Sequence, residues 1–281
     1  MELYAAGFNA WNQLVFNEQA IRDEPRDLAS FQVVFRGPNI DVPTSRLSYT
    51  LVLKESKIIS AGIGIPPSEQ ELILDYNGAE NALGEILAAE LDATAPSGAL
   101  LVKFPDLSSR KAGKSSHSWP CKKGIRHIAA YDAGWVVLYD DGTVATLGDP
   151  RFGDCLGREV TEGSPAEEPG EVLDLNNLGD PIRKVAAGGY TVAALTESGS
   201  LYAWGVESPG THRRQQAIPG LSGIPNYVEV DDDEDVQDMA VGESHAIALT
   251  AHGSIHVIGG NENGQLGYSE DKVMDQSELR S

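Results

Sequence analysis

The segment Ala187–Gly205 reads AGGYTVAALTESGSLYAWG, and altered copies of it occur at Val241–Gly259, Ala130–Gly148 and Arg46–Gly62. In each copy a leucine precedes a closing glycine by nine or ten residues, as Leu195 precedes Gly205. A unit that recurs along one chain indicates an array of similar supersecondary elements, so the repeats take priority over any search for catalytic motifs.

The spacing of the closing glycines sets the size of the repeat. Gly148, Gly205 and Gly259 are 57 and 54 residues apart, and Gly7 precedes Gly62 by 55. The interval from Gly62 to Gly148 is 86 residues, which is the length of two shorter units. We therefore expect a degenerate copy in that interval, built from the segments 85–91 and 99–105, with Pro105 in place of the glycine.

Within a unit the pattern favours strands. Residues 190–196 and 200–204 are short apolar runs joined by Glu197-Ser198-Gly199, which predicts a hairpin. Residues 184–187 form a preceding strand that ends at Gly188-Gly189, where the backbone can adopt conformations closed to other residues. Each unit thus supplies at least three antiparallel strands. Only Glu69–Leu91 favours a helix instead.

These residues resemble the repeats of the regulator of chromosome condensation family. The resemblance rests on Val185–Gly205 and on Gly260–Gly267, whose letters GNENGQLG match the loop that follows the family's repeat. Gly7–Leu14 is similar, with Asn12 in a glycine position, a replacement that fits because Asn tolerates the left-handed conformation. His245 keeps a histidine typical of the family, whereas Thr191, Gly134 and Tyr49 replace it. The resemblance implies a β-propeller.

The sequence therefore predicts an all-β fold, a β-propeller of antiparallel blades. Six blades are expected, with five to seven possible, because six strands of the LYAWG type end near Gly7, Gly62, Pro105, Gly148, Gly205 and Gly259. Ring closure should be incomplete or unusual: either an incomplete blade uses Phe31–Phe35, or the natural chain continues beyond Ser281. Residues 1–281 are expected to form one propeller domain, with 268–281 as an irregular tail.

Composition narrows the functional classes. No apolar stretch is long enough for a membrane span, and the amino terminus lacks a secretory signal, so we expect a nuclear or cytoplasmic protein. The two cysteines, Cys121 and Cys155, should be free thiols. His117 and Cys121 have no second pair at zinc-site spacing, and no phosphate-binding loop or nucleophile motif occurs. We expect no metal, no cofactor, no catalytic residues and no enzymatic activity.

Charge is the main guide to partners. The chain has 42 acidic and 21 basic residues, a formal net charge of −21, which argues against direct nucleic-acid binding. Acidic residues crowd two connections, at 229–238 and 162–171, and these are either solvated loops or a docking surface for a basic protein. One basic stretch lies at 110–126 and contains Trp119. The candidate protein-binding residues are Asp231, Asp232, Asp233, Glu234, Asp235 and Trp119.

The resemblance implies a function in protein interaction. The chain resembles the short divergent members of the family, which look like adaptor subunits. Some of these are associated with a Jumonji-type dioxygenase and chromatin, and others with a small zinc protein that serves diphthamide and transfer-RNA modification. We expect a non-catalytic scaffold whose rim loops bind a protein partner of basic charge, such as a histone, a small GTPase, or a protein of chromatin or tRNA modification. The alternative is guanine-nucleotide exchange on a Ran-like small GTPase, although no matching wedge motif occurs.

Overall fold

The computed structural model describes residues 1–17, 24–46, 48–55, 57–63, 78–206, 217–230 and 234–268. These residues form antiparallel sheets with a few short helices. The chain divides into two compact units: unit 1 comprises Met1–Tyr76 with Gly260–Met274, and unit 2 comprises Asn77–Gly259 with Asp275–Ser281. The single domain expected over 1–281 stays a prediction, and the expected tail lies, beyond Tyr268, outside the described residues.

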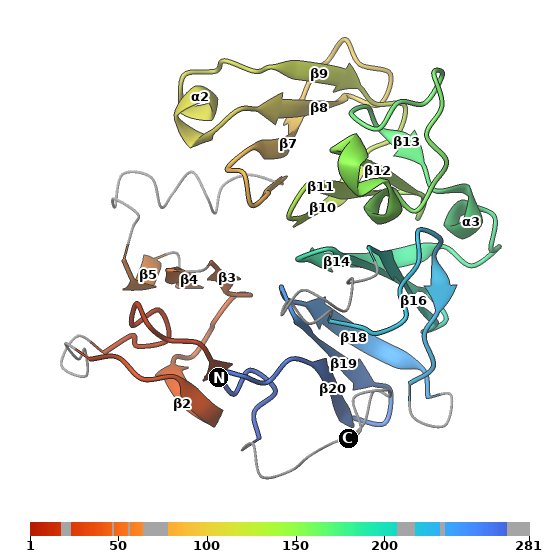
Figure 1. Ribbon diagram of the computed structural model, residues 1–281. Helices are drawn as coiled ribbons and strands as arrows, with labels where there is room; N and C mark the ends of the chain where they lie inside the picture. Colours follow the sequence, from red (N-terminus) through yellow and green to blue (C-terminus); the bar gives the residue numbers. More distant parts are fainter. Residues whose placement is uncertain are drawn as a thin grey trace. The chain divides into compact units, whose positions relative to one another are not determined.

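Unit 2 contains four consecutive sheets, coloured from yellow to blue in Figure 1. The first consists of β6 (Gly78–Glu80), β7 (Ile86–Leu91), β8 (Ala99–Phe104) and β9 (His117–Pro120). The second consists of β10 (Ile125–Tyr131), β11 (Gly134–Tyr139), β12 (Val144–Gly148) and β13 (Gly170–Glu171). The third consists of β14 (Ile182–Gly188), β15 (Thr191–Thr196), β16 (Leu201–Gly205) and β17 (Asn226–Tyr227). The fourth consists of β18 (Val236–Val241), β19 (His245–Thr250) and β20 (Ile255–Gly259).

Short helices lie in the connections of unit 2. They are α2 (Leu107–Lys111) between β8 and β9, the 3-10 helix η2 (Pro150–Leu156) after β12, and α3 (Leu173–Asn176) before β14. Within the described ranges, no helix has the length and hydropathy of a membrane span.

Unit 1 contains two smaller sheets. One pairs β1 (Glu2–Gly7) with β2 (Leu28–Arg36), and the other consists of β3 (Thr44–Ser45), β4 (Tyr49–Lys54) and β5 (Lys57–Gly62). The described residues thus form five blades of three or four strands and one two-stranded sheet, compatible with the six predicted blades. Phe31–Phe35 does form part of β2 and pairs with β1. Closure of the ring stays a prediction.

The six strands expected at repeat ends are all present. β1, β5, β12, β16 and β20 each end at the predicted closing glycine, and β8 ends at Phe104, next to Pro105. The helix expected over Glu69–Leu91 is wrong in its described part, where β6 and β7 are strands. The apolar run Ile86-Leu87-Ala88-Ala89 is ambiguous between helix and buried strand, and pairing with β8 decides it.

A close backbone contact explains the closing glycines. A Cβ atom on Gly205 would lie 2.0 Å from the carbonyl oxygen of Tyr190, where the paired strand begins. A Cβ atom on Gly62 would likewise lie 2.1 Å from the carbonyl oxygen of Ser48, and one on Gly259 would lie 2.3 Å from that of Ser244. The repeat ends in glycine because the two strands of each hairpin meet there without room for a side chain.

The hydrophobic cores of unit 2 lie between neighbouring sheets, and β11 and β15 are therefore buried on both faces. Along β15, Val192 and Ala194 pack with residues of β11 and β12, while Ala193 and Leu195 pack with residues of β18 and β19. Alternate side chains of a strand point to opposite faces, so one strand serves two cores. This double burial accounts for the unbroken apolar run 192–195 in the sequence.

In each sheet of unit 2 a turn joins the first two strands, and these turns are here called the first turns. The first turn of each sheet contacts the first turn of the next sheet. The N–H of Ala82, in the first turn of the first sheet, donates to the carbonyl of Asp132, in that of the second, at 3.3 Å. The N–H of Asp132 in turn donates to the carbonyl of Gly189, in the first turn of the third sheet, at 2.8 Å. A Cβ atom on Gly189 would lie 2.3 Å from the carbonyl oxygen of Glu243. All four sheets of unit 2 are therefore connected backbone to backbone.

Two loops of unit 1 repeat the same hydrogen bonds. In the first, Asn9 Oδ1 accepts from the N–H of Leu14 and Gln13 Oε1 accepts from that of Trp11. In the second, Asn261 and Gln265 accept from the N–H groups of Leu266 and Asn263. Asn12 adopts φ 55°, matching φ 79° at Gly264, so the predicted left-handed Asn is confirmed. Asp27 links the loops by accepting from Asn9 N and Asn263 Nδ2.

Candidate protein-interaction surface

The predicted acidic site lies in the connection from β17 to β18. Asp231, Asp232 and Asp233 fall outside the described residues, whereas Glu234 and Asp235 fall within them. Buried Val230 and Val236 flank the segment, and the N–H of Val236 donates to the carbonyl of Gly199 at 2.9 Å. The carbonyl of Asp235 accepts from Ala251 at 2.8 Å. Apolar burial and backbone bonds thus fix both ends of the acidic connection.

The described acidic residues of this connection differ in whether a basic side chain lies close enough to compensate their charge. The Asp238 carboxylate pairs with the Lys184 ammonium, and although burial pushes its pKa upward, this bond and one from Met239 N–H hold the pKa below its usual value. Glu234 Oε1 lies 3.6 Å from His252 Nδ1. Among the described acidic residues of the connection, Asp235 and Glu229 are exposed, whereas the charge of Asp238 is compensated by Lys184.

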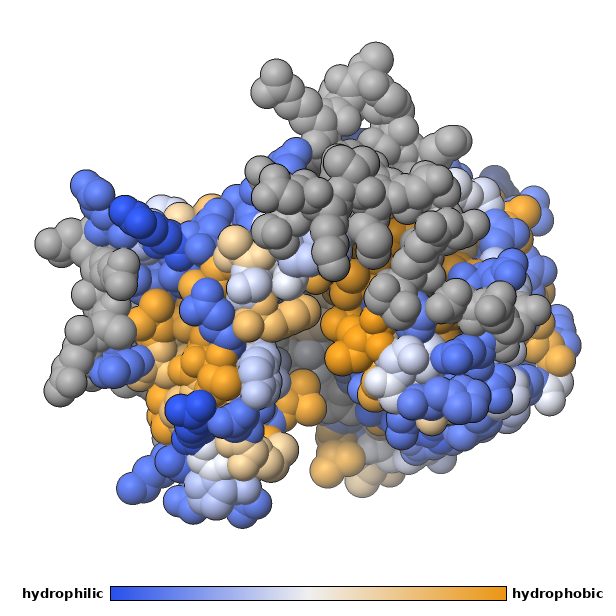
Figure 2. All heavy atoms as spheres, turned by 90° about the horizontal axis from the view of Figure 1, so that it is seen from below, coloured by the Kyte–Doolittle hydropathy of each residue, from blue (hydrophilic) through white to orange (hydrophobic). Residues whose placement is uncertain are grey.

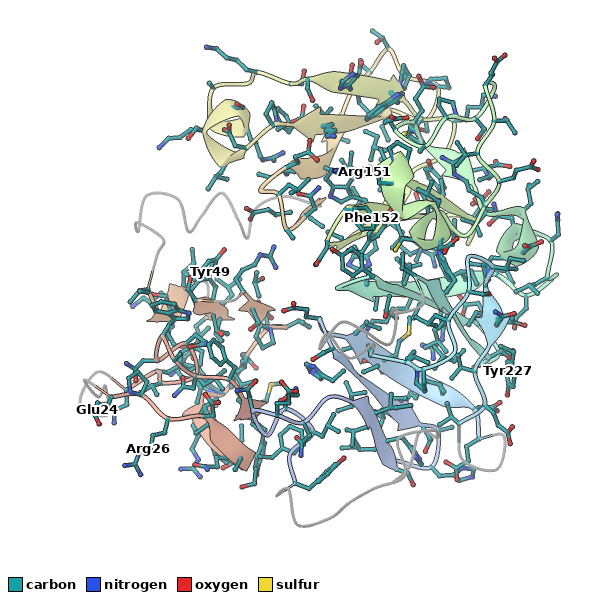
Figure 3. The ribbon with its side chains drawn as sticks, viewed as in Figure 1. Glu24, Arg26, Tyr49, Arg151, Phe152 and Tyr227 are labelled. Atoms are coloured by element: carbon teal, nitrogen blue, oxygen red, sulfur yellow. The ribbon has the colours of Figure 1, made fainter. Side chains whose placement is uncertain are left out.

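Exposed apolar side chains precede the acidic connection. Tyr227 on β17 is 50% exposed and contacts Tyr202 edge to face, with ring centroids 6.0 Å apart, and Ile224 is 57% exposed. Figure 3 shows Tyr227 at the edge of its sheet. Exposed aromatic residues beside charged ones are typical of protein interfaces. Surface hydrophobic groups interspersed with hydrophilic side chains are also visible on the face shown in Figure 2.

Trp119 belongs to a different sheet from the acidic residues. It lies on β9 opposite Leu101, half-buried against the core that contains Leu87 and Trp135. Its ring stacks on that of His117, with centroids 5.8 Å apart and planes 9° from parallel. The structure does not bring the two parts of the predicted site together. Whether Trp119 binds a partner stays a prediction.

Sequence reasoning missed a side-chain cluster at η2. Asp149 caps the helix by accepting from the N–H of Arg151 at 2.9 Å, and Pro150 follows it. Asp149 Oδ2 also accepts from Arg151 Nη2 at 2.6 Å. The guanidinium lies 5.9 Å from the centroid of the Phe152 ring, which stacks on Tyr190 of the next sheet at 5.0 Å. The signal was present as Asp-Pro, a favoured start of a helix.

This η2 cluster presents an oriented cation. The Arg151 side chain is 76% exposed, yet its bonds to Asp149 and its position over Phe152 restrict its rotamers. Figure 3 shows Arg151 and Phe152 close together beside η2. Arginine and tyrosine dominate the energetics of protein interfaces, and a preordered side chain loses less entropy on binding. The cluster is suited to recognition of a protein surface.

Two observations concern metal binding and nucleophilic chemistry. Within the described ranges, no three His, Cys, Asp or Glu side chains gather in a way that would hold a metal ion. Both cysteines are buried and free, which confirms the expected thiols. Burial raises the pKa of Cys155 to about 12, so this thiol is poorly suited to act as a nucleophile.

Comparisons with known proteins agree with the repeat. The Regulator of chromosome condensation (RCC1) repeat matches residues 182–208 and 236–265. The chain is 33% identical over 144 residues to the human E3 ubiquitin-protein ligase HERC2, covering 48% of this chain and 3% of HERC2. It is 33% identical over 138 residues to the human Regulator of chromosome condensation, covering 47% of this chain and 30% of that protein. The chain thus spans less than a third of either relative.

A solved structure supports the same assignment. Prp20p from Saccharomyces cerevisiae superposes with a TM-score of 0.59 at 15% identity, covering 99% of this chain and 84% of that one. Antiparallel blades with glycine-closed hairpins define a repeat-built β-propeller. The chain therefore carries RCC1-type repeats and resembles the RCC1-repeat β-propeller family in sequence and in fold.

The η2 cluster predicts a shifted titration. The hydrogen bonds from Arg151 hold the pKa of Asp149 below its usual range. A carboxyl group whose pKa is lower in the folded than in the unfolded state stabilises the fold at pH values above its unfolded-state pKa. This stabilisation is lost as the pH falls through the folded-state pKa. Carboxyl NMR should find Asp149 titrating below an ordinary Asp in the native protein, and R151Q should raise its pKa. R126Q, which removes an exposed arginine from β10, should leave it unchanged. Equal pKa values in native protein and R151Q would contradict the cluster.

Proposed function

We propose that this chain is a non-catalytic scaffold that binds a protein partner through loops carried by its blades. The observation that best supports this proposal is the η2 cluster, in which the exposed Arg151 donates to Asp149 and lies over Phe152, whose ring stacks on Tyr190. Loops on a rigid framework are where binding residues concentrate. The buried faces of β11 and β15 supply that framework.

For the acidic connection 229–238, which is a different part of the chain from the η2 cluster, the partner that fits best is a basic protein surface. The net charge of −21 and the acidic connection 229–238 favour approach of cations, with Tyr227 and Ile224 as neighbouring apolar contacts. The structure of Prp20p was described with its binding properties to Gsp1p and histones, which supports a histone-like partner or a small GTPase. Direct nucleic-acid binding is not part of the proposal, and the proposed location is nuclear or cytoplasmic.

The acidic connection can be tested against a matched control. Changing Asp231, Asp232, Asp233 and Asp235 to Asn should weaken binding of a lysine-rich histone-tail peptide about tenfold, since roughly 1.4 kcal/mol of attraction is lost over four charges. The control changes Glu162, Glu167, Glu168 and Glu171 to Gln, which removes four charges from the other acidic connection. Fluorescence anisotropy at two salt concentrations measures both. Equal weakening by the two variants would remove the specific site and leave only net charge.

The second candidate function is guanine-nucleotide exchange, favoured by the likeness to Prp20p. An exchange factor must stabilise the nucleotide-free GTPase relative to the bound form. We expect catalytic amounts of this chain to leave the release of labelled GDP from a Ran-type GTPase unchanged. Accelerated release would establish the exchange function and displace the scaffold as the main role.

A further inference from the structure

Basic residues are concentrated in one part of this acidic chain. Between residues 103 and 126 there are seven lysines and arginines and a single acid, Asp106, whereas acids outnumber bases two to one overall. The seven are Lys103, Arg110, Lys111, Lys114, Lys122, Lys123 and Arg126. They lie on β8, in the connection from β8 to β9, in the link from β9 to β10 and at the start of β10. This stretch of the chain therefore carries a local charge opposite to that of the whole.

Six of these basic residues fall into two groups, one with ion-pair partners and one without, and the seventh, Arg126, donates to the carbonyl of Asp140. Lys103 Nζ lies 2.8 Å from Glu85, Arg110 lies 3.7 Å from Glu90, and Lys123 lies 2.9 Å from Asp141. Lys111, Lys114 and Lys122 are exposed, and within the described part of the chain none of them forms an ion pair. Lys111 and Lys114 precede β9 and Lys122 follows it, so uncompensated lysines flank both ends of this strand.

β9 is the last strand of its sheet. The order of that sheet is β6-β7-β8-β9, and no further described strand pairs with β9. At four residues it is longer than β13 and β17, the last strands of the next two sheets, which have two each, and one residue shorter than β20, the last strand of the fourth sheet. Figure 1 shows it at the outside of its sheet. An outer strand offers backbone groups to which an extended peptide can add.

The side chains of β9 add an apolar contact. His117 and Trp119 lie on one face of the strand with their rings stacked, and His117 is exposed while Trp119 is half-buried. Lysines are also used to protect sheet edges from unwanted pairing. Here, however, the strand itself holds His117, Ser118, Trp119 and Pro120, and the lysines lie beyond its ends. That arrangement leaves the middle of the strand accessible.

We propose that β9 binds an extended acidic segment of a partner protein, which adds to the sheet edge and places its carboxylates against Lys111, Lys114 and Lys122. Alternate side chains of the bound segment contact His117 and Trp119. This inference deepens the scaffold function and rests on it, but it uses a different surface from the acidic connection and the opposite charge. A nucleic acid would meet the same lysines without using the backbone of β9, so its binding would not depend on strand pairing.

The test uses a fluorescein-labelled peptide of alternating glutamate and valine with the full chain. It should bind, and the triple variant K111Q/K114Q/K122Q should weaken binding at least about tenfold because three charge contacts are lost. The control triple variant R26Q/K54Q/K57Q removes three cations from unit 1 and should bind like the native protein. A peptide of equal charge with proline in place of alternate valines should bind poorly, because it lacks N–H donors needed for strand pairing.

The outcomes separate the alternatives. Native-like binding by K111Q/K114Q/K122Q, or equal binding of the proline-containing peptide, would overturn the proposal. Tighter binding of a single-stranded RNA of similar charge would overturn it in favour of a nucleic-acid site. Histone-tail binding measured on the same triple variant should be unchanged, so failure of the β9 site is distinguishable from failure of the scaffold function.

Discussion

The close approach of backbone to backbone at the first turns is the constraint on which unit 2 depends. Gly188 and Gly189 meet the carbonyl groups of Gly242 and Glu243 at distances that leave no room for a Cβ atom. The N–H of Asp132 reaches Gly189 from the preceding sheet. A glycine pair can therefore contact both neighbours at once. Because the first turns contact one another, the sheets to which they belong pack face to face. A strand such as β15 therefore has one face in each of two separate cores.

This packing determines where binding residues can lie. The central strands β11 and β15 have few exposed side chains, so accessible side chains are concentrated in connections and outer strands. The η2 cluster joins one sheet to the next through Phe152 and Tyr190, the acidic connection is fixed by Val230 and Val236, and β9 lies at an open edge. Charge is also segregated: a basic sheet edge and an acidic connection occur on one strongly acidic chain, which would allow two unlike partner segments to be bound at once.

The sequence predicted the features that depend on local rules. Closing glycines marked the ends of β12, β16 and β20, and Asn12 was correctly placed in a left-handed conformation, because steric limits on a single residue decide both. It could not decide between helix and strand for Ile86–Leu91, since pairing with β8 is a long-range contact. The outer strand β9 and the Arg151–Phe152–Tyr190 arrangement depend on neighbours distant in sequence. The acidic residues and Trp119 were grouped by residue type, and topology assigns them to different parts of the fold.

The role of the first turns can be measured directly with two glycine variants. Gly189 and Gly220 both have positive φ, at 55° and 71°, but a Cβ atom on Gly189 would strike Glu243 whereas one on Gly220 meets no described atom within 4 Å. G220A should lower the free energy of unfolding by about 1–2 kcal/mol, the cost of the left-handed backbone alone. G189A should lower it by roughly 2 kcal/mol more, because the neighbouring turn must move. Equal losses in urea unfolding of the two variants would contradict the account.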